Sequence, residues 1–114
     1  MTSYLSLEAI KRHKVVSRDG DVLGRVDDLV FDPTSGEIRY VILASGGALG
    51  IGDKLFVVPF ADAEIDYPRE RLIFNFSADD VKTAPGFVRG EFPDFAPAYR
   101  KDIEGFYAAR RKAA

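Results

Sequence analysis

The segment LGRVDDLVFDPTSGEIRYVILAS, residues 23–45, decides the fold of this chain. Its last third, residues 38–45, combines β-branched and aromatic residues with apolar side chains at neighbouring positions, which is typical of a strand buried on both faces. Between the two apolar parts, Pro33 fixes φ early in a turn and Gly36 supplies a positive φ late in it. The segment therefore predicts two strands joined by a hairpin, with the second strand central in a sheet.

The first of these strands, residues 22–32, does not keep a single period of two. Its apolar residues include Leu23, Val26 and Leu29, which cannot all face one side of a regular strand. A β-bulge near Asp27 and Asp28 would restore the phase and bend the strand, as the closure of a small barrel requires. We therefore expect a strongly curved strand here.

The flanking sequence predicts further short strands. Ser6 can cap a short helix over residues 6–13, and the strand of residues 14–17 leads into a hairpin turn at Asp19-Gly20. After residue 53, strands are expected at residues 55–58, 63–66 and 72–76, and then a single helical turn capped by Ser77. About six short strands joined by tight turns describe an all-β, antiparallel barrel or sandwich.

The C-terminal part has a different composition, so we divide the chain into residues 1–87 and an aromatic-rich extension, residues 88–114. Residues 86–97 hold glycines, prolines and aromatics without a period and predict irregular structure. From Pro97, apolar side chains recur at helical spacing, which predicts a short amphipathic helix. The candidate interface residues of this part are its large apolar side chains Phe92, Phe95, Tyr99, Ile103, Phe106 and Tyr107.

Charge and composition exclude several classes of protein. The 114 residues carry a formal net charge of -2, which argues against a nucleic-acid binder that relies on phosphate neutralisation. The chain has no cysteine, so disulfides, thiolate metal sites and thiol nucleophiles are excluded. No apolar run is long enough to span a membrane and the N-terminus does not resemble a signal peptide, so we expect a cytoplasmic location.

The glycine-rich stretch GGALGIG, residues 46–52, resembles part of a phosphate-binding loop. Asp53, however, stands where that loop requires lysine, and a strand rather than a helix is expected to follow. We therefore interpret the stretch as a connection between strands. The predicted turn residues of the chain are Gly20, Gly24, Gly36, Gly47, Gly50, Gly52 and Pro59.

No group of residues predicts catalysis. His13 is the only histidine, and its basic neighbours Lys11, Arg12 and Lys14 indicate a solvated side chain. Adjacent strand residues point to opposite faces, so Asp27 and Asp28 could bind one cation with Asp32 only if the bulge turned them together. We predict no catalytic residue, no cofactor and no metal ligand, and hence a protein that is not an enzyme.

Several motifs, taken in order, resemble a known family. They are LGRVDDLVFD at residues 23–32, GEIRYV at residues 36–41, GG with LGIGDK at residues 46–54, VPF at residues 58–60, and APGF at residues 84–87. In this order and with these gaps they resemble the PRC-barrel domain over about residues 5–87. The resemblance implies a small, strongly bent β-barrel like the cytoplasmic domain of the photosynthetic reaction-centre H subunit and the C-terminal domain of a ribosome-maturation factor. It also implies a bacterial protein, free-standing here, that docks onto other macromolecules and has no established catalytic motif.

The aromatic extension suggests how such docking would occur. The apolar residues named above could cover an open end of the barrel, or they could form the interface of a homodimer or of a complex with an unidentified protein. The charged end, Arg110, Arg111 and Lys112, is expected to be solvated. The alternative function is binding of a small molecule or metal ion, through the loop Gly46–Gly52 or the acidic group near Asp28. A small barrel should fill its interior with side chains, which disfavours this alternative.

Overall fold

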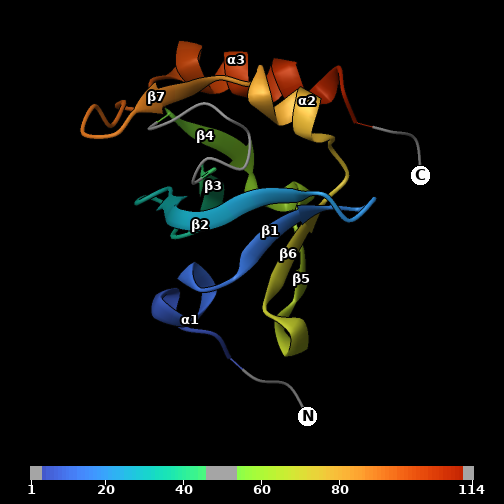
Figure 1. The fold of residues 1–114 in the computed structure, drawn as a ribbon. Coiled ribbons are helices and arrows are strands. Elements are labelled where there is room, and N and C mark those ends of the chain that lie inside the picture. Colours follow the sequence, from blue (N-terminus) through green and yellow to red (C-terminus); the bar gives the residue numbers. More distant parts are fainter. Residues whose placement is uncertain (1–3, 46–53, 112–114) are drawn as a thin grey trace.

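The computed structural model describes residues 4–45 and 54–111, and within these ranges the chain forms one seven-stranded sheet with short helices around it (Figure 1). The strands are β1 (Lys14–Ser17), β2 (Val22–Phe31), β3 (Ile38–Ala44), β4 (Lys54–Pro59), β5 (Glu64–Asp66), β6 (Arg71–Phe74) and β7 (Gly86–Val88). The helices are α1 (Leu7–Lys11), α2 (Ala78–Lys82) and α3 (Pro97–Ala108), with the 3₁₀ turns η1 (Phe60–Asp62) and η2 (Tyr67–Arg69).

The sheet differs from the expected barrel in three respects. Its strand order is β5-β6-β1-β2-β3-β4-β7, so β5 and β7 are edges and the hydrogen-bonded sheet of the described residues is not closed. The expected count of about six strands was too low, because β7 forms from a stretch that was predicted irregular. Strand β1 pairs with β6 in parallel, whereas the other pairs are antiparallel. These differences arise from pairing between distant segments, which no local pattern encodes.

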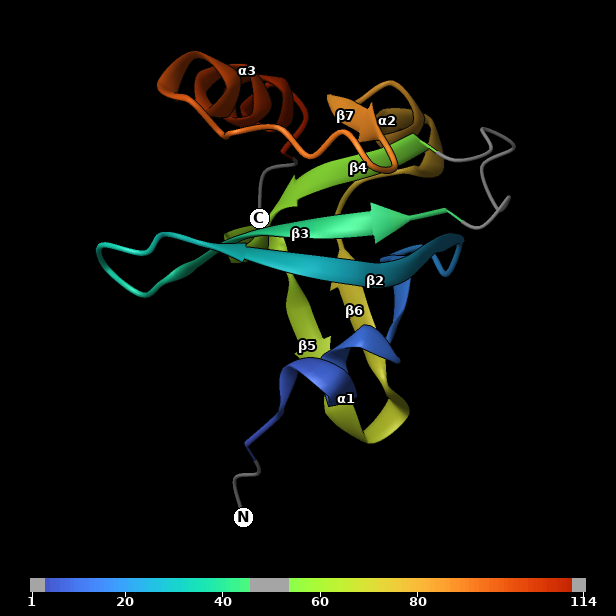
Figure 2. The ribbon, with the colours of Figure 1, turned by 90° about the vertical axis from the view of Figure 1, so that its left-hand side faces the viewer.

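The predicted bend in β2 is confirmed. The register between β2 and β3 shifts between Val26 and Asp28, and again between Val30 and Phe31. The first shift leaves Asp27 as an extra residue in β2 and the second leaves Arg39 as an extra residue in β3, and each increases the local twist. As a result the sheet is strongly bent: β2, β3 and β4 cross the molecule while β5 and β6 run steeply away from them (Figures 1 and 2).

Three predicted glycines lie where the backbone has a positive φ or leaves no room for a side chain. Gly20 and Gly36 have φ of +97° and +78° in the two predicted turns. Gly24, predicted as a turn residue, lies instead inside β2; at its φ of +147° a Cβ would lie 2.2 Å from the carbonyl oxygen of Ala44, so the close approach of β2 and β3 excludes any side chain. Pro59, predicted as the turn residue that ends the strand of residues 55–58, is itself the last residue of β4 and directly precedes η1. Gly47, Gly50 and Gly52 lie outside the described residues.

The core includes residues from the C-terminal extension. Buried side chains from the strands are joined by Phe95 and by Ile103 and Tyr107 of α3, both 0% exposed. Helix α3 packs against β4 and lies across one end of the sheet (Figures 1 and 2). Residues 1–87 and the extension therefore share one hydrophobic core.

His13 was wrongly predicted to be solvated. Its side chain is only 2% exposed, and Nδ1 lies 3.0 Å from the carbonyl oxygen of Ala9. The chain turns inward between α1 and β1, where the backbone N–H of His13 donates to Ile10, and this turn carries the imidazole into the interior. Its charged neighbours in the sequence remain at the surface, as Lys11, Arg12 and Lys14 are all exposed.

The short helices begin at the residues that the sequence indicated. The Ser6 hydroxyl accepts from the backbone N–H of Ala9, and Ser77 forms a reciprocal capping box with Asp80. Helix α3 starts at Pro97, whose missing N–H is tolerated in the first turn. No helix of the described residues is long and apolar enough to cross a membrane.

Candidate functional site

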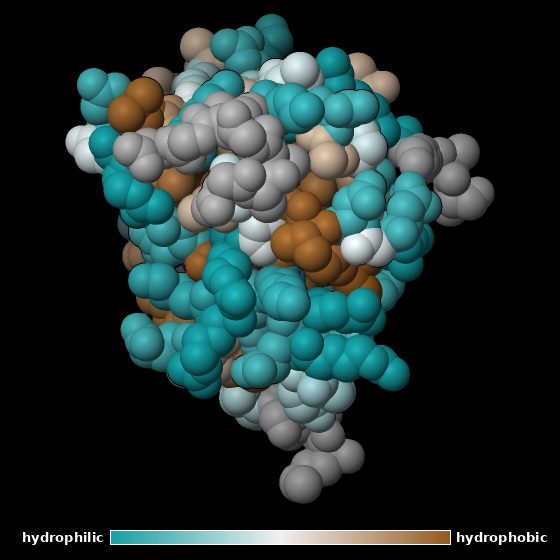
Figure 3. Space-filling model, in the orientation of Figure 1, coloured by the Kyte–Doolittle hydropathy of each residue, from teal (hydrophilic) through white to brown (hydrophobic). Residues whose placement is uncertain are grey.

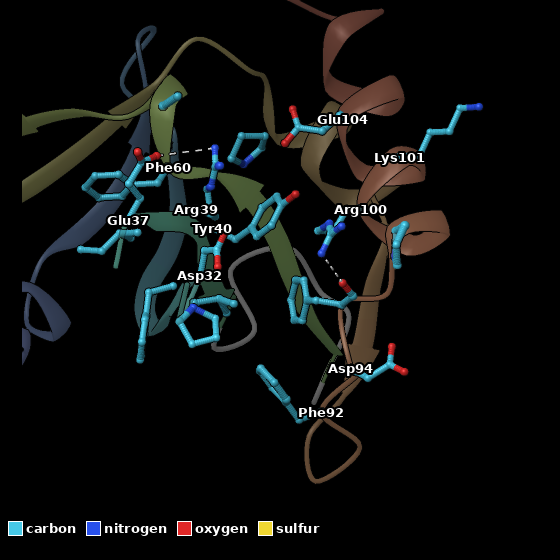
Figure 4. A pocket seen from close by; sticks show the side chains of 18 of the residues that line it. Asp32, Glu37, Arg39, Tyr40, Phe60, Phe92, Asp94, Arg100, Lys101 and Glu104 are labelled. Carbon is cyan, nitrogen blue, oxygen red and sulfur yellow. Dashed lines mark hydrogen bonds and ion pairs between the residues drawn. The ribbon is translucent and has the colours of Figure 1, made fainter. Parts of the chain in front are cut away.

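An open groove of about 910 Å³ lies between the β2–β3 hairpin and the C-terminal extension (Figure 4). One wall comes from residues 30–33 and 37–40, at the ends of β2 and β3. The other wall comes from the segment before α3 and from α3 itself, while Pro59 and Phe60 contribute from the end of β4. In Figure 2, α3 lies above the β2–β3 hairpin, on the same side of the molecule.

Aromatic rings in mutual contact form much of the groove. Tyr40 stacks on Phe95 with ring centroids 5.3 Å apart, and Phe95 meets Phe92 at 5.4 Å. Phe92 in turn contacts Phe87 edge to face at 5.7 Å, and Tyr99 supports Phe95 from α3 at 5.3 Å. Such pairs prefer tilted or offset geometries and rigidify one another. The groove is therefore bounded by a continuous row of aromatic side chains.

Three large apolar side chains of the groove are exposed to solvent, and we call them the apolar rim. Phe31 is 60% exposed, Phe92 59% and Ile38 40%. Phe31 and Ile38 are register partners across β2 and β3, so they lie side by side at the end of the hairpin. Exposed apolar side chains that gather at one recess commonly mark an interaction site. The face shown in Figure 3 is mostly hydrophilic, with a group of hydrophobic residues near its centre.

Phe95 has an unusual backbone conformation. Its φ is +55°, which is uncommon for a bulky residue without special support. Two contacts hold this segment: Asp94 Oδ1 accepts from the backbone N–H of Ala96 at 3.0 Å, and the Phe95 carbonyl accepts from Arg100 Nη1 at 3.1 Å. Strained residues fixed by their surroundings cluster at functional sites. Here the contacts from Asp94 and Arg100 hold the strained segment with the Phe95 ring against Tyr40.

The charged groups of the groove differ in how they are paired. Arg39 lies 3.7 Å from Glu37, and Arg111 binds Asp62 in a bidentate pair with both N···O distances at 2.8 Å. Arg100 and Lys101 lie at ion-pair distance from no carboxylate in residues 4–45 and 54–111; Arg100 instead donates to a carbonyl. The groove is lined by equal numbers of acidic and basic side chains, and among the described residues Asp32 and Asp94 lack an ion pair as Arg100 and Lys101 do.

The Tyr40 hydroxyl lies in the groove beside the carboxylate of Glu104. Burial raises the pKa of Tyr40, and the nearby carboxylate of Glu104 raises it further. The phenol is therefore protonated over the whole physiological range. Glu104 itself lies 3.7 Å from Arg111, which fixes it on the α3 side of the groove.

The structure divides the predicted interface residues into two sets. Phe92 and Phe95 line the groove, and Tyr99 lies behind Phe95. Ile103 and Tyr107 are in the core, and Phe106 is half-buried beneath the guanidinium of Arg110, 3.6 Å from its ring centroid. Sequence reasoning missed Phe31, Ile38 and Tyr40. The sequence could have indicated them, because the apolar residues Phe31 and Ile38 flank the turn at Pro33–Gly36, where polar residues are usual.

The described residues give no support to the alternative of a metal-ion site at the acidic group near Asp28. The Asp27 carboxylate accepts from Arg89 Nη2 at 3.1 Å, and Asp28 Oδ1 accepts from the backbone N–H of Leu29 at 2.8 Å. In residues 4–45 and 54–111, no group of three or more His, Cys, Asp or Glu side chains could hold a metal ion. The loop Gly46–Gly52, the other alternative, lies outside the described residues.

The basic C-terminus was expected to be solvated, and Arg110 and Arg111 keep 36% and 40% of their side-chain surface exposed, but both also contact the rest of the molecule. Arg111 is bound to Asp62 of η1, and Arg110 lies between Phe106 and Asp80, 3.7 Å from the latter. Lys112 lies outside the described residues. The guanidinium groups thus fasten α3 to the rest of the molecule.

Comparison with known proteins identifies the architecture. A family model described as the PRC-barrel domain matches residues 4–81. No curated protein sequence matches the chain. Among solved structures, the crystal structure of a 16S ribosomal RNA processing protein, RimM, from Pseudomonas aeruginosa is similar, with a TM-score of 0.50 and 15% sequence identity. The similarity covers 66% of this chain and 45% of the RimM chain, so the chain spans less than half the length of that protein.

Proposed function

Because this chain belongs to the PRC-barrel domain family, and because its groove exposes an apolar rim, we propose that it is a non-enzymatic protein-interaction module. The single observation that carries the proposal is the apolar rim of Phe31, Ile38 and Phe92 around an aromatic recess. Aromatic side chains and arginine are enriched at the energetic centres of protein interfaces, and the groove contains both.

The electrostatics favour a protein partner over a nucleic acid. Phosphate neutralisation requires several free cations on one surface, whereas the chain has a net charge of -2. Within the groove, Arg39 and Arg111 are already paired with carboxylates. The apolar rim would then provide most of the binding free energy, through burial of its exposed surface.

We assign no catalytic step to the groove. Its carboxylates are engaged structurally: Asp94 accepts from Ala96, Asp32 accepts from the backbone N–H of Thr34 at 2.8 Å, and Glu104 and Glu37 contact arginines. The likeness to RimM supports the fold at 15% identity, and we do not extend ribosomal RNA processing to this chain.

Self-association is the second form of the proposal. The extension was expected to form a homodimer, but Ile103 and Tyr107 are used inside the chain, so the surface left for a second copy is the apolar rim. An isologous contact through a shared apolar patch is the usual basis of a two-fold dimer. Light scattering of the intact protein at micromolar concentration measures this, and a monomeric mass would exclude it.

The proposed function can be tested by replacing side chains of the apolar rim while leaving the buried side chains unchanged. Phe31→Ser with Phe92→Ser changes two side chains that are more than half exposed, so the fold should persist, as circular dichroism would verify. The matched control is Tyr67→Ser, which removes a 41% exposed aromatic at η2, outside the groove. We expect affinity capture to lose specific partners with the rim variant only. Equal capture by the rim variant and the control would contradict the proposal.

A further inference from the structure

We infer that the end of the molecule around α1 binds the surface of a membrane that contains anionic lipids. In both views α1 and the turn between β5 and β6 lie at the end opposite α3 (Figures 1 and 2). The backbone N–H of Lys14 donates to the carbonyl of Glu70 at 2.9 Å and so ties β1 to this turn. We call this region, residues 4–14, Arg25 and residues 66–71, the α1 end. The inference is independent of the groove.

A row of cations crosses three neighbouring strands at the α1 end. Lys14 of β1 is the register partner of Arg25 on β2 and of Arg71 on β6, so the three side chains lie on one face of the sheet. Like charges directly opposite one another across a sheet oppose folding. A row that breaks this local rule is more typical of a binding surface than of a structural one.

Helix α1 adds two further cations to this row. Lys11 and Arg12 lie at its C-terminal end, and the carbonyl of Arg12 accepts from Arg25 Nη1 at 3.3 Å, which joins the helix to the row. Four cations of the α1 end are exposed and lie at ion-pair distance from no carboxylate of the described residues: Lys11, Arg12, Lys14 and Arg25.

The acidic side chains of the α1 end do not balance this charge. Asp66 binds both Arg71, at 2.8 Å, and Arg69, at 3.4 Å, so it neutralises only one of these two charges. Glu8 and Glu70 are the other carboxylates of the α1 end. This end therefore has six basic and three acidic side chains, in a chain whose formal net charge is -2. It attracts anions although the molecule as a whole does not.

Apolar side chains are exposed beside these cations. Tyr4 is 98% exposed and Leu7 51%, and Leu5 is exposed between them in the sequence. Leu7 and Lys11 occupy positions i and i+4 of α1, so they share one face of the helix. Tyr67, in the turn between β5 and β6, is exposed as well. The surface of the α1 end thus combines apolar and basic side chains.

This combination selects a lipid surface over other anionic partners. Attachment to a membrane interface is strengthened both by burial of apolar side chains and by attraction of cations to anionic headgroups. None of the exposed apolar side chains lines the groove; they lie at an extremity of the molecule, where they can enter the headgroup layer. A nucleic acid would use the cations, but Leu5 and Leu7 have no aromatic face on which a base could stack.

The experiment measures flotation of the intact protein with vesicles. One set contains phosphatidylcholine alone, and the other is an equimolar mixture of phosphatidylcholine and phosphatidylglycerol. We expect binding to the anionic vesicles only, and weaker binding at high salt, because ions screen the attraction. Vesicles of both kinds that bind the protein equally would overturn the inference.

A pair of charge variants locates the attraction. Lys14→Glu with Arg25→Glu should weaken binding to the anionic vesicles by roughly tenfold or more, since each cation near an anionic surface contributes roughly fivefold. The matched control is Lys82→Glu with Lys101→Glu, which changes the net charge equally on α2 and α3. We expect the control to lose no more than about twofold. Circular dichroism checks that each variant is folded, and equal losses would overturn the inference.

A tryptophan reporter tests insertion of the apolar side chains. The chain contains no tryptophan, so Tyr4→Trp introduces a single one at a position that is almost fully exposed. On anionic vesicles its emission should shift to the blue and be quenched by lipids with brominated chains. Phe92→Trp, in the groove, is the control and should show neither effect. An unshifted Tyr4→Trp emission, or a shift at Phe92→Trp instead, would contradict the inference.

The remaining outcomes separate this inference from other partners and from the proposed function. Tighter binding of single-stranded RNA or of polyglutamate than of the anionic vesicles would assign the basic surface to another partner and overturn the inference. The rim variant, Phe31→Ser with Phe92→Ser, should bind the vesicles as the unaltered protein does. Loss of vesicle binding in that variant would place the contact at the groove and overturn the inference, whereas loss of captured proteins alone supports both proposals.

Discussion

At the scale of single residues, Tyr107 combines complete burial with a hydroxyl that has no partner. The side chain is 0% exposed, it packs against Phe76 at 4.8 Å, and its oxygen forms no hydrogen bond in the described residues. An unpaired buried hydroxyl opposes folding, while the ring around it favours folding. The phenyl ring and the hydroxyl therefore have opposite effects on stability.

The first prediction separates these effects. Tyr107→Phe should leave the free energy of unfolding unchanged or raise it by about 1 kcal/mol, because an unsatisfied polar group is removed. Tyr107→Ala should lower it by about 3–5 kcal/mol through loss of burial and creation of a cavity. Urea denaturation measures both variants. A large loss in the phenylalanine variant would show that the hydroxyl does have a partner.

The second prediction concerns alkaline pH. Burial, with smaller contributions from Asp62 and Asp80, raises the pKa of Tyr107. The unfolded chain therefore ionises this phenol first, and stability should fall as pH rises above the unfolded value of about 10. Tyr107→Phe should reduce this fall, and denaturation midpoints at neutral and alkaline pH measure it. Some fall should remain, since burial also raises the pKa of Tyr40 and Tyr99.

The third prediction uses two glycines with positive φ. In Gly24→Ala the new Cβ would meet the Ala44 carbonyl oxygen at 2.2 Å, and we expect a loss of about 3 kcal/mol. In Gly36→Ala nothing lies within 4 Å of the Cβ, so only the cost of the left-handed conformation remains, about 1 kcal/mol. Thermal unfolding compares the two variants. Equal losses would mean that β2 and β3 can separate at this point.

At the scale of elements, the β5–β6 hairpin contains a carboxylate that stabilises its turn. Asp66 accepts from Arg71 at 2.8 Å and from Arg69 at 3.4 Å, and the hairpin forms one edge of the sheet. The hydrogen bond from Arg71, with a smaller contribution from Arg69, lowers the pKa of Asp66. This residue therefore links the stability of the edge to pH.

The fourth prediction follows from the sign of that shift. Because the pKa of Asp66 is lower in the folded state, its stabilisation is complete above the unfolded value of about 4 and is lost as pH falls below it. Asp66→Asn should therefore reduce the acid sensitivity of unfolding. Asp19→Asn, in an exposed turn, serves as the control. An unchanged acid profile in Asp66→Asn would argue against this link.

Local sequence predicted most elements, and the reasons are visible in particular residues. Ser6 and Ser77 cap the helices that they were expected to cap, and Gly20 and Gly36 take the positive φ of their turns. Strand β7 was missed because Gly86–Val88 has no alternation and is a strand only through its pairing with β4. His13 was misjudged because its burial depends on how α1 turns into β1.

At the scale of the whole molecule, the C-terminal extension completes the core. Ile103 and Tyr107 are fully buried, and Arg111 fastens the end of α3 to Asp62. The extension also provides one wall of the groove. The region that forms the candidate binding site is thus the same region that closes the hydrophobic core.

The fifth prediction tests this dual role. A chain ending at residue 88 would expose the core surface now covered by α3, and we expect it to lose cooperative thermal unfolding and to bind a hydrophobic dye. Calorimetry and dye fluorescence measure this against the intact chain. A truncated chain that unfolds cooperatively at the original temperature would show that residues 1–88 hold a sufficient core alone.

The sequence by itself determined the local structure of this protein: its turns, its caps, the bulge near Asp27 and Asp28, and its membership of a family of bent sheets. These features depend on interactions between residues that are near in the chain, so a local pattern encodes them. Only the tertiary structure decided which aromatics are buried and which are exposed, and that Arg100 lies beside Tyr40. The groove joins a hairpin to a helix some 60 residues away, and packing over that separation leaves no periodic signal in the sequence.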